Sequence, residues 1–301
     1  MRDTIGGYRC LTPMQTAGSG SARWCMAMRG LGRYFLKEFL APVYPVNADT
    51  VIGRRQMERC LRFEQKKQRL YSAASCVIGN VLVPVIDFFR ENGHYYAVSE
   101  AVPDGCPTAE AAMRMTEKEK KKLLYELSLC LQRLHAQEIV HADLKPEHIF
   151  LMPQDGVWKP RLIDLDSGFL LDDPPQSEQE LEGDPAYLAP EMFLYMVQHT
   201  VRPDAAVDTF AFGAIIHQIW SGALPGFDHE HYHYLYEAAL DGAEIHLELP
   251  AEWKTTVQRM LNARPEDRPS DAEVTLLFNE PSSASERAQP ARNGLSRLMK
   301  A

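Results

Sequence analysis

The sequence lacks several features that would assign it to a special class of protein. It contains no run of about 18 apolar residues, so it predicts no membrane-spanning helix. The first residues, MRDTIGGYRC, include no apolar segment of the kind found in signal peptides. None of the six cysteines forms a C-x-x-C pair, which argues against a zinc site and a disulfide framework. We therefore expect a cytoplasmic protein with reduced thiols.

An excess of positive charge is also absent. The chain has 41 acidic and 32 basic residues and a formal net charge of -9. Such a balance disfavours binding to nucleic acid and to anionic membranes. We expect no nucleic acid and no membrane among its partners, and instead a protein or a small molecule.

The first hundred of the 301 residues are rich in predicted strands. Segments 8–30 and 32–40 are predicted to form strands around a Gly/Ser turn, and residues 54–74 a charged amphipathic helix. The segments NVLVPVIDFF and HYYAVSEAV follow, and the Asn92-Gly93 pair between them predicts a hairpin.

Helices are predicted to dominate the remainder. Thr116 and Glu119 form a capping box before a stripe of leucines that ends at Leu134. The segment VDTFAFGAIIHQIW is apolar on nearly all sides and is followed by Gly222, which predicts a buried central helix with a glycine cap. Residues 279–301 are rich in Ser, Pro and Ala and are expected to be disordered.

One stretch carries a specific chemical signal. HADLKPEHIF, from His141 to Phe150, resembles the catalytic loop H-R-D-L-K-x-x-N of the protein kinase family. The resemblance implies that Asp143 accepts or orients the proton of the attacking hydroxyl and that Lys145 contacts the transferring phosphate. A carboxylate and a cation suit this reaction because its catalysis depends on positioning and charge stabilisation.

Later segments resemble further motifs of the family, in the family's order. LIDLDSG resembles the D-F-G segment, which implies that Asp164 holds magnesium, and GDPAYLAPE resembles the end of the activation segment. Asp208 in VDTFAFG and Arg268 in PEDRPS match positions that stabilise the family's larger lobe.

Upstream, the resemblance implies a nucleotide site. AGSGSA resembles a glycine-rich loop, with Gly18 and Gly20 present and Arg23 in place of a third glycine. Lys37 in YFLKEF matches the strand lysine that contacts the α and β phosphates of ATP.

Two further parts of this site are implied. Lys37 should pair with a glutamate of the helix over 54–74, for which Glu64 is a better candidate than Glu58 because it lies nearer the following strand. SEAV matches the hinge between lobes, where the backbone groups of Glu100 and Val102 would bind adenine.

The sequence departs from the family pattern at chemically important positions. Ala142 replaces the arginine of H-R-D, Asp184 replaces the threonine of G-T-P, and Phe35 stands where a small residue normally lies beneath adenine. His148 replaces the metal-binding asparagine and Asp166 the glycine of D-F-G.

These last two changes suggest a compensated metal site. If LIDLD is an extended strand, Asp164 and Asp166 face the same side and both approach the cation, with His148 beside them. The cation would be Mg²⁺, or Mn²⁺ if the imidazole is a ligand. Asp166 pointing into solvent is the alternative.

The resemblance, which covers residues 8 to about 278, implies an α+β, bilobal kinase fold with an N-lobe over 1–102 and a C-lobe over 103–278. The first hypothesis is an ATP-dependent serine/threonine protein kinase of the non-RD type, without control by activation-loop phosphorylation. Its partners would be a protein substrate with a Ser/Thr acceptor and a regulatory protein. The alternatives are a pseudokinase scaffold, favoured by His148, Asp184, Phe35 and Arg23, and a small-molecule phosphotransferase.

Overall fold

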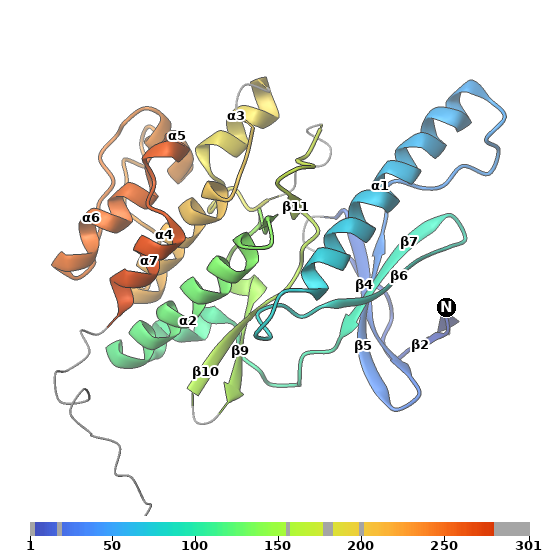
Figure 1. Cartoon of the computed structure of the whole chain (residues 1–301), viewed down its shortest axis with the longest axis horizontal. Coiled ribbons are helices and arrows are strands. Elements are labelled where there is room, and N and C mark those ends of the chain that lie inside the picture. The colour runs from blue at the N-terminus through green and yellow to red at the C-terminus, as the bar shows by residue number, and fades with distance from the viewer. Residues whose placement is uncertain (1–3, 17–19, 155–156, 177–182, 199–201, 280–301) are drawn as a thin grey trace, which may run out of the picture.

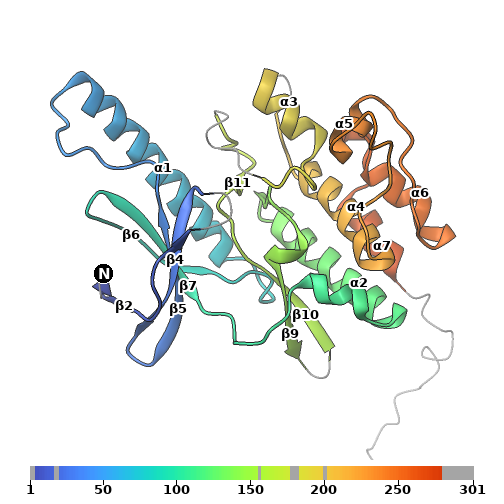
Figure 2. The ribbon, with the colours of Figure 1, turned by 180° about the vertical axis from the view of Figure 1, so that it is seen from behind.

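The computed structural model of the chain describes residues 4–16, 20–154, 157–176, 183–198 and 202–279. Within these ranges the chain forms a sheet-rich part and a helical part. The segment after residue 100 connects the two parts and can be followed from β7 towards α2 in Figure 2. The predicted disordered tail lies, apart from Asn279, outside the described residues.

An antiparallel sheet forms the first part. Its strands follow the order β1-β2-β4-β5-β7-β6, and β3 pairs with β4 beside this path. Asn92 and Gly93 both have positive φ angles, 53° and 83°, and join β6 to β7, so the predicted hairpin is confirmed. The strands are β1 Thr4–Ile5, β2 Tyr8–Cys10, β3 Gln15–Thr16, β4 Ala22–Arg29, β5 Gly32–Phe39, β6 Val85–Glu91 and β7 His94–Glu100.

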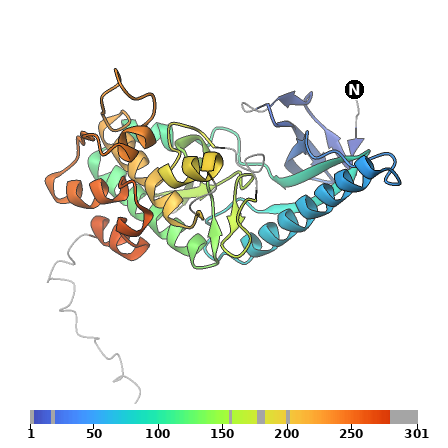
Figure 3. The same ribbon diagram turned by 90° about the horizontal axis from the view of Figure 1, so that it is seen from above.

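One long helix, α1 (Val51–Ser75), packs against this sheet. It begins three residues before the predicted start because the Thr50 hydroxyl accepts a hydrogen bond from the Gly53 amide at 2.9 Å and caps the first turn. Figures 1 and 3 show α1 running along the sheet, with its N-terminal turns extending beyond the strands. Its C-terminal half therefore makes the contacts with the helical part.

The helical part is built around α4. The predicted capping box of Thr116 and Glu119 is present at the start of α2, and Gly222 ends α4 in the left-handed conformation, with a φ angle of 90°. Most of α4 is buried, as its apolar sequence predicts. The helices are η1 Ala109–Arg114, α2 Glu117–His135, η2 Pro146–His148, α3 Pro190–Gln198, α4 Ala206–Ser221, α5 Leu235–Leu240, α6 Ala251–Met260, η4 Pro265–Asp267 and α7 Asp271–Phe278.

Four short strands lie between the sheet and the helices. They are β8 (Ile139–Val140), β9 (Ile149–Gln154), β10 (Val157–Leu162) and β11 (Phe169–Leu170), paired as β9 with β10 and β8 with β11. They lie in the middle of the molecule in Figure 1. The loops at the ends of these strands carry the residues of the catalytic motifs.

The prediction that LIDLD is an extended strand is wrong. Strand β10 ends at Leu162, and Asp164 adopts a positive φ of 62°. The turn is stabilised by the Asp164 carboxylate, whose Oδ1 accepts a hydrogen bond from the Asp166 amide at 3.3 Å. Aspartate tolerates the left-handed region because its side chain bonds the backbone in this way.

No helix in the described ranges is long and apolar enough to cross a membrane.

The large core joins the inner face of α1 to the helical part, whereas a smaller cluster around Leu36 and Val98 lies on the other face of the sheet.

Candidate active site between the sheet and the helices

The loop after β8 is fixed by Asp208 at the start of α4. The Asp208 carboxylate accepts hydrogen bonds from the backbone amides of His141 and Ala142, at 2.7 and 2.9 Å. Ala142 adopts a positive φ of 61°, which turns the chain sharply before Asp143. Burial raises the pKa of Asp208, but the combined effects of His135 and His141, through hydrogen bonds and charge, outweigh burial and hold this pKa below its ordinary value. A charged carboxylate in the core thus shapes the loop.

Asp143 and Lys145 lie together as the sequence predicts. Lys145 Nζ is 3.5 Å from Asp143 Oδ2 and 3.7 Å from Asp184 Oδ2, while Asp143 Oδ1 accepts a hydrogen bond from the Asp184 amide at 3.0 Å. Burial raises the pKa of Asp143 above its ordinary value. The group is therefore a base of increased strength beside a cation.

Lys37 of β5 reaches the turn after β10. Its Nζ donates to both carboxylate oxygens of Asp164, at 3.0 and 2.9 Å, and also pairs closely with the Asp166 carboxylate. Burial would lower the pKa of Lys37, but Asp166 and Asp164 outweigh burial and raise it. The two carboxylates do converge on one cation, which in this structure is the lysine.

Glu64 does not pair with Lys37, which corrects the prediction. Its Oε2 accepts a hydrogen bond from the Tyr95 hydroxyl at 3.3 Å. From α1, Lys67 contacts the turn that pairs with Lys37, since its Nζ donates to the backbone carbonyl of Asp166 at 2.5 Å. Lys67 is one turn further along α1, which brings it opposite the turn that contains Asp166.

His148 lies between the two aspartates of the site. Its Nδ1 is 2.9 Å from the backbone carbonyl oxygen of Asp143, and its Nε2 is 3.8 Å from Asp164 Oδ2. Burial lowers the pKa of His148, so the ring is neutral near pH 7. Across the described ranges, no cluster of three or more His, Cys, Asp or Glu side chains is arranged to hold a metal ion by itself. Metal binding by His148 and Asp166 therefore stays a prediction.

Two aromatic rings lie on the face of the sheet that carries Lys37. Phe35 stacks on Trp24 with ring centroids 5.3 Å apart, on the face of the sheet that carries Lys37. Arg23 instead pairs with Glu38 at 2.6 Å, on the opposite face. Arg23, at the position of the third glycine, therefore points away from the Lys37 side.

The loop and hinge positions are only partly described. Gly20 has a φ of 75° and precedes β4, whereas Gly18 lies outside the described residues. Glu100 ends β7 and Val102 follows it in the segment that leads to the helical part. Both positions thus lie at the junction of the two parts, where the sequence predicts adenine binding.

The end of the activation segment is anchored in the helical part. Arg268 donates two hydrogen bonds of 2.6 Å to the Glu191 carboxylate, and the two side chains are only 1% and 2% exposed. A paired arrangement of this type satisfies two charges that could not be buried separately. The expected architectural role of Arg268 agrees with this contact.

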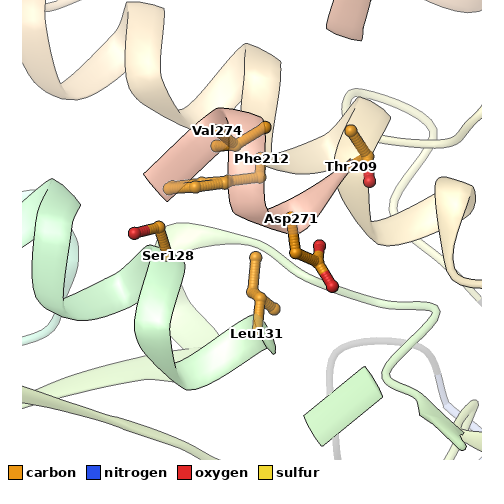
Figure 4. A pocket seen from close by; sticks show the side chains of 6 residues that line it. All are labelled: Ser128, Leu131, Thr209, Phe212, Asp271 and Val274. Atoms are coloured by element: carbon orange, nitrogen blue, oxygen red, sulfur yellow. The ribbon is translucent and has the colours of Figure 1, made fainter. Parts of the chain in front are cut away.

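A small cavity lies away from this site, among α2, α4 and α7. Its volume is about 10 Å³, which has room for about one water molecule. Figure 4 shows the Asp271 carboxylate pointing away from the apolar lining. The cavity is lined by Ser128, Leu131, Thr209, Phe212, Asp271 and Val274. It is far too small for a nucleotide.

Most of the chain matches a known protein family. Residues 63–279 match the protein kinase domain family. The chain belongs to the protein kinase family. This match covers well over half of the chain and includes every catalytic-loop and activation-segment residue discussed above.

Individual relatives are distant serine/threonine kinases. The chain is 30% identical over 194 residues to serine/threonine-protein kinase ULK3 of Rattus norvegicus, a match over 62% of this chain and 39% of that protein. It is 28% identical over 159 residues to MAP kinase-interacting serine/threonine-protein kinase mnk-1 of Caenorhabditis elegans, over 48% and 22% of the two chains. The matches thus span less than half the length of these relatives.

A solved structure shows the same fold. The PknI kinase domain of Mycobacterium tuberculosis superimposes with a TM-score of 0.60 at 19% identity, covering 91% of this chain and 95% of that chain. The predicted α+β kinase fold, with a sheet-rich part and a helical part, is confirmed.

Two residues of this region were not predicted from the sequence. Lys67 lies on the same helical face as Cys60 and Ala74, so a lysine within an apolar stripe was the available signal. His135 follows the leucine stripe of α2 and bonds both Asp208 and Asp271. No local pattern shows that these three side chains meet, because they come from distant parts of the chain.

Proposed function

We propose that this protein kinase transfers the γ-phosphate of ATP to serine or threonine hydroxyls of protein substrates. The observation that carries the proposal is the meeting of Lys37, Asp164, Asp143 and Lys145 between the two parts of the molecule. We further propose that residues 1–102 and 103–278 act as the two lobes that enclose the nucleotide.

Asp143 would orient the acceptor hydroxyl and take its proton. Its raised pKa supports this role because a stronger base accepts a proton more readily. Lys145 lies beside it and would stabilise negative charge on the transferring phosphoryl group. These groups are held in place before substrate binds, by the Asp184 amide and by the Asp208 contacts to the loop.

Lys37, Gly18, Gly20 and the backbone of Glu100 and Val102 would bind the nucleotide. The Trp24–Phe35 stack supports a flat apolar surface for the base on the Lys37 face of the sheet. Tyr71 lies near the turn that contains Asp164 and Asp166, and its buried hydroxyl finds no hydrogen-bond partner among the described residues.

The donor set of the acidic turn fits magnesium. This ion prefers carboxylate oxygens and is usually bound by one or two carboxylates together with substrate phosphates. Asp164 and His148 would hold the ion, and the neutral imidazole would suit Mn²⁺ as well. Asp166, the third predicted ligand, pairs with Lys37 in this structure. When bound, the metal would neutralise charge on the nucleotide phosphates.

Control without activation-loop phosphorylation is part of the proposal. Ala142 cannot pair with a phosphate, and the activation segment already carries carboxylates bound to α1. Arg69 contacts Asp172 and Asp173 at 2.6 and 3.2 Å, and Lys66 lies 3.8 Å from Asp173. Permanent negative charges thus occupy the basic positions that an added phosphate would otherwise bind.

We infer a reducing compartment such as the cytoplasm. All six cysteines are free, and Cys25, Cys60 and Cys130 are buried. Free buried thiols are typical of reducing surroundings. A regulatory protein that binds the α1 and activation-segment surface remains part of this proposal.

The test is incubation of purified protein with [γ-³²P]ATP and Mg²⁺ or Mn²⁺, with and without a generic basic protein. Label on phosphoserine or phosphothreonine after acid hydrolysis is the expected result. Nucleotide binding without transfer would favour the pseudokinase, and label on a small molecule alone would favour the third class.

A further inference from the structure

A strand lysine that binds phosphates needs a fixed carboxylate to hold its long side chain in place. The residue expected to do this, Glu64, is bonded to Tyr95 instead. Lys37 nevertheless has two carboxylate partners, and both belong to the turn after β10 rather than to α1. The helix therefore contributes no carboxylate to this pair among the described residues.

The helix contributes a cation at this place. Lys67 is 7% exposed and its Nζ lies 5.6, 5.8 and 5.9 Å from the ring centroids of Phe39, Phe63 and Tyr71. A charged lysine is almost never buried without a partner. One of its partners is the Asp166 backbone carbonyl, at 2.5 Å.

The charges near Lys37 are thus arranged in the opposite way to the expected pair, because α1 supplies a cation where a carboxylate was expected. Two lysines, one from β5 and one from α1, face one acidic turn that lies between them. Without that turn, Lys37 and Lys67 would repel each other in a low-dielectric setting. Asp166 is the residue that contacts both, through its carboxylate to Lys37 and its carbonyl to Lys67.

We infer that Asp166 is the positioning residue for Lys37, and that Lys67 anchors Asp166 to α1, so that this pair replaces a helix glutamate. The inference rests on the proposed function, since it assigns Lys37 to nucleotide phosphates. Asp164 and Asp166 then have separate tasks. A carboxylate that binds a metal ion is a weaker partner for a lysine, so Asp164 serves the metal and Asp166 retains Lys37.

This assignment explains two departures from the family pattern by one contact. The aspartate at position 166 and the lysine at position 67 are each unfavourable alone, since one would crowd Asp164 with like charge and the other would bury a cation. Together with Lys37 they compensate one another, because the Asp166 carboxylate pairs with Lys37 while its backbone carbonyl accepts a hydrogen bond from Lys67.

The experiment moves the carboxylate from the turn to the helix. Four proteins are compared: wild type, Asp166→Gly, Asp166→Gly with Lys67→Glu, and Asp166→Gly with Gln68→Glu. For each, calorimetry measures ATP binding, and initial rates give KM for ATP, kcat and the Mg²⁺ dependence at saturating ATP. Gln68 is the matched control because it is the next helix residue and is exposed. Thermal melting checks that each variant is folded.

We expect Asp166→Gly to weaken ATP binding and raise KM for ATP about tenfold or more. Adding Lys67→Glu should recover most of this loss, because it supplies a carboxylate from α1 to Lys37, whereas adding Gln68→Glu should recover none. If Asp166 merely supported the fold, moving its carboxylate to position 67 of α1 would not restore ATP binding.

Other outcomes would overturn the inference in distinguishable ways. Unchanged ATP binding in Asp166→Gly, with active wild type, would overturn the positioning role and leave the proposed function intact. A raised Mg²⁺ requirement in Asp166→Gly that Lys67→Glu does not relieve would make Asp166 a metal ligand instead. Failure of wild type to bind ATP would overturn both proposals. If wild type binds ATP without transferring phosphate, the comparison of ATP affinities among the variants still tests the role of Asp166.

Discussion

At the scale of single residues, Lys37 and Glu64 separate what sequence can and cannot predict. Lys37 was identified from its place in a strand after a Gly/Ser turn, and it does reach the acidic turn. Position along α1 alone predicts Glu64 as the helix partner, whereas the structure places Lys67 at the acidic turn. Helix residues three and four apart share a face, so Glu64 and Lys67 were equally placed by periodicity.

This contrast gives a direct comparison of two substitutions. Lys37→Met should weaken ATP binding and lower transfer by roughly a hundredfold or more, because it removes a cation from the nucleotide phosphates. Glu64→Gln should change either quantity less than about threefold, since a glutamine oxygen still accepts from Tyr95. Calorimetry and initial rates measure both effects. A loss in Glu64→Gln as large as that in Lys37→Met would mean that Glu64 is the working partner of Lys37.

At the scale of elements, α1 holds the activation segment through exposed ion pairs. Arg69, Asp172 and Asp173 are 49%, 61% and 22% exposed, so solvent screens these pairs and each contributes little to stability. Both carboxylates act on the same short segment after β11. Their combined loss should loosen that segment without unfolding the protein.

Asp172→Asn combined with Asp173→Asn should therefore lower the transfer rate about two- to tenfold. Ser167→Ala combined with Ser177→Ala should leave the rate of dephosphorylated protein nearly unchanged. Asp267→Asn is the matched control, because its ion pair with Arg264 is also exposed and lies in the helical part. Initial rates of transfer at low ionic strength measure the effect of each set of substitutions. Collapse of activity in the serine variant, with no effect in the aspartate variant, would show that phosphorylation controls the segment.

Element boundaries show where sequence reasoning is limited. The hairpin at Asn92-Gly93, the capping box at Thr116 and the glycine cap after α4 each depend on a local backbone preference, and all three are present. The strand through LIDLD was overextended, because alternation of apolar residues does not show that Asp164 turns the backbone to a φ of 62°. The predicted same-side arrangement of Asp164 and Asp166 was reached by a turn instead.

At the scale of the whole molecule, His135 connects three helices to the catalytic loop. Its Nε2 is 3.0 Å from Asp208 at the start of α4, and its Nδ1 is 2.9 Å from Asp271 at the start of α7. Burial would lower the pKa of His135, but the hydrogen bonds to Asp208 and Asp271 outweigh burial and raise it to about 10. The protonated ring thus stabilises the native state.

The sign of the pH dependence follows from this raised pKa. The ordinary histidine pKa is about 6.5, so stabilisation by His135 is complete below that pH and is lost as pH rises towards about 10. His135→Gln should be less stable than wild type by a few kcal/mol at pH 6, and the difference should shrink by pH 10. Urea denaturation at both pH values measures it. Exposed His231, which pairs with Asp228 at 2.7 Å, supplies the control His231→Gln. A constant difference across this range would show that His135 is neutral in the native state.

The central claim is that the groups gathered between the two parts of the molecule perform phosphoryl transfer. The most direct measurement compares wild type with Asp143→Asn, determining ATP binding by calorimetry and transfer to a generic protein from [γ-³²P]ATP at saturating nucleotide. The account predicts that both proteins are folded and bind ATP with similar affinity, while transfer falls by roughly a hundredfold or more in the variant. Equal transfer by the two proteins, or no transfer by wild type while ATP is bound, would contradict the claim.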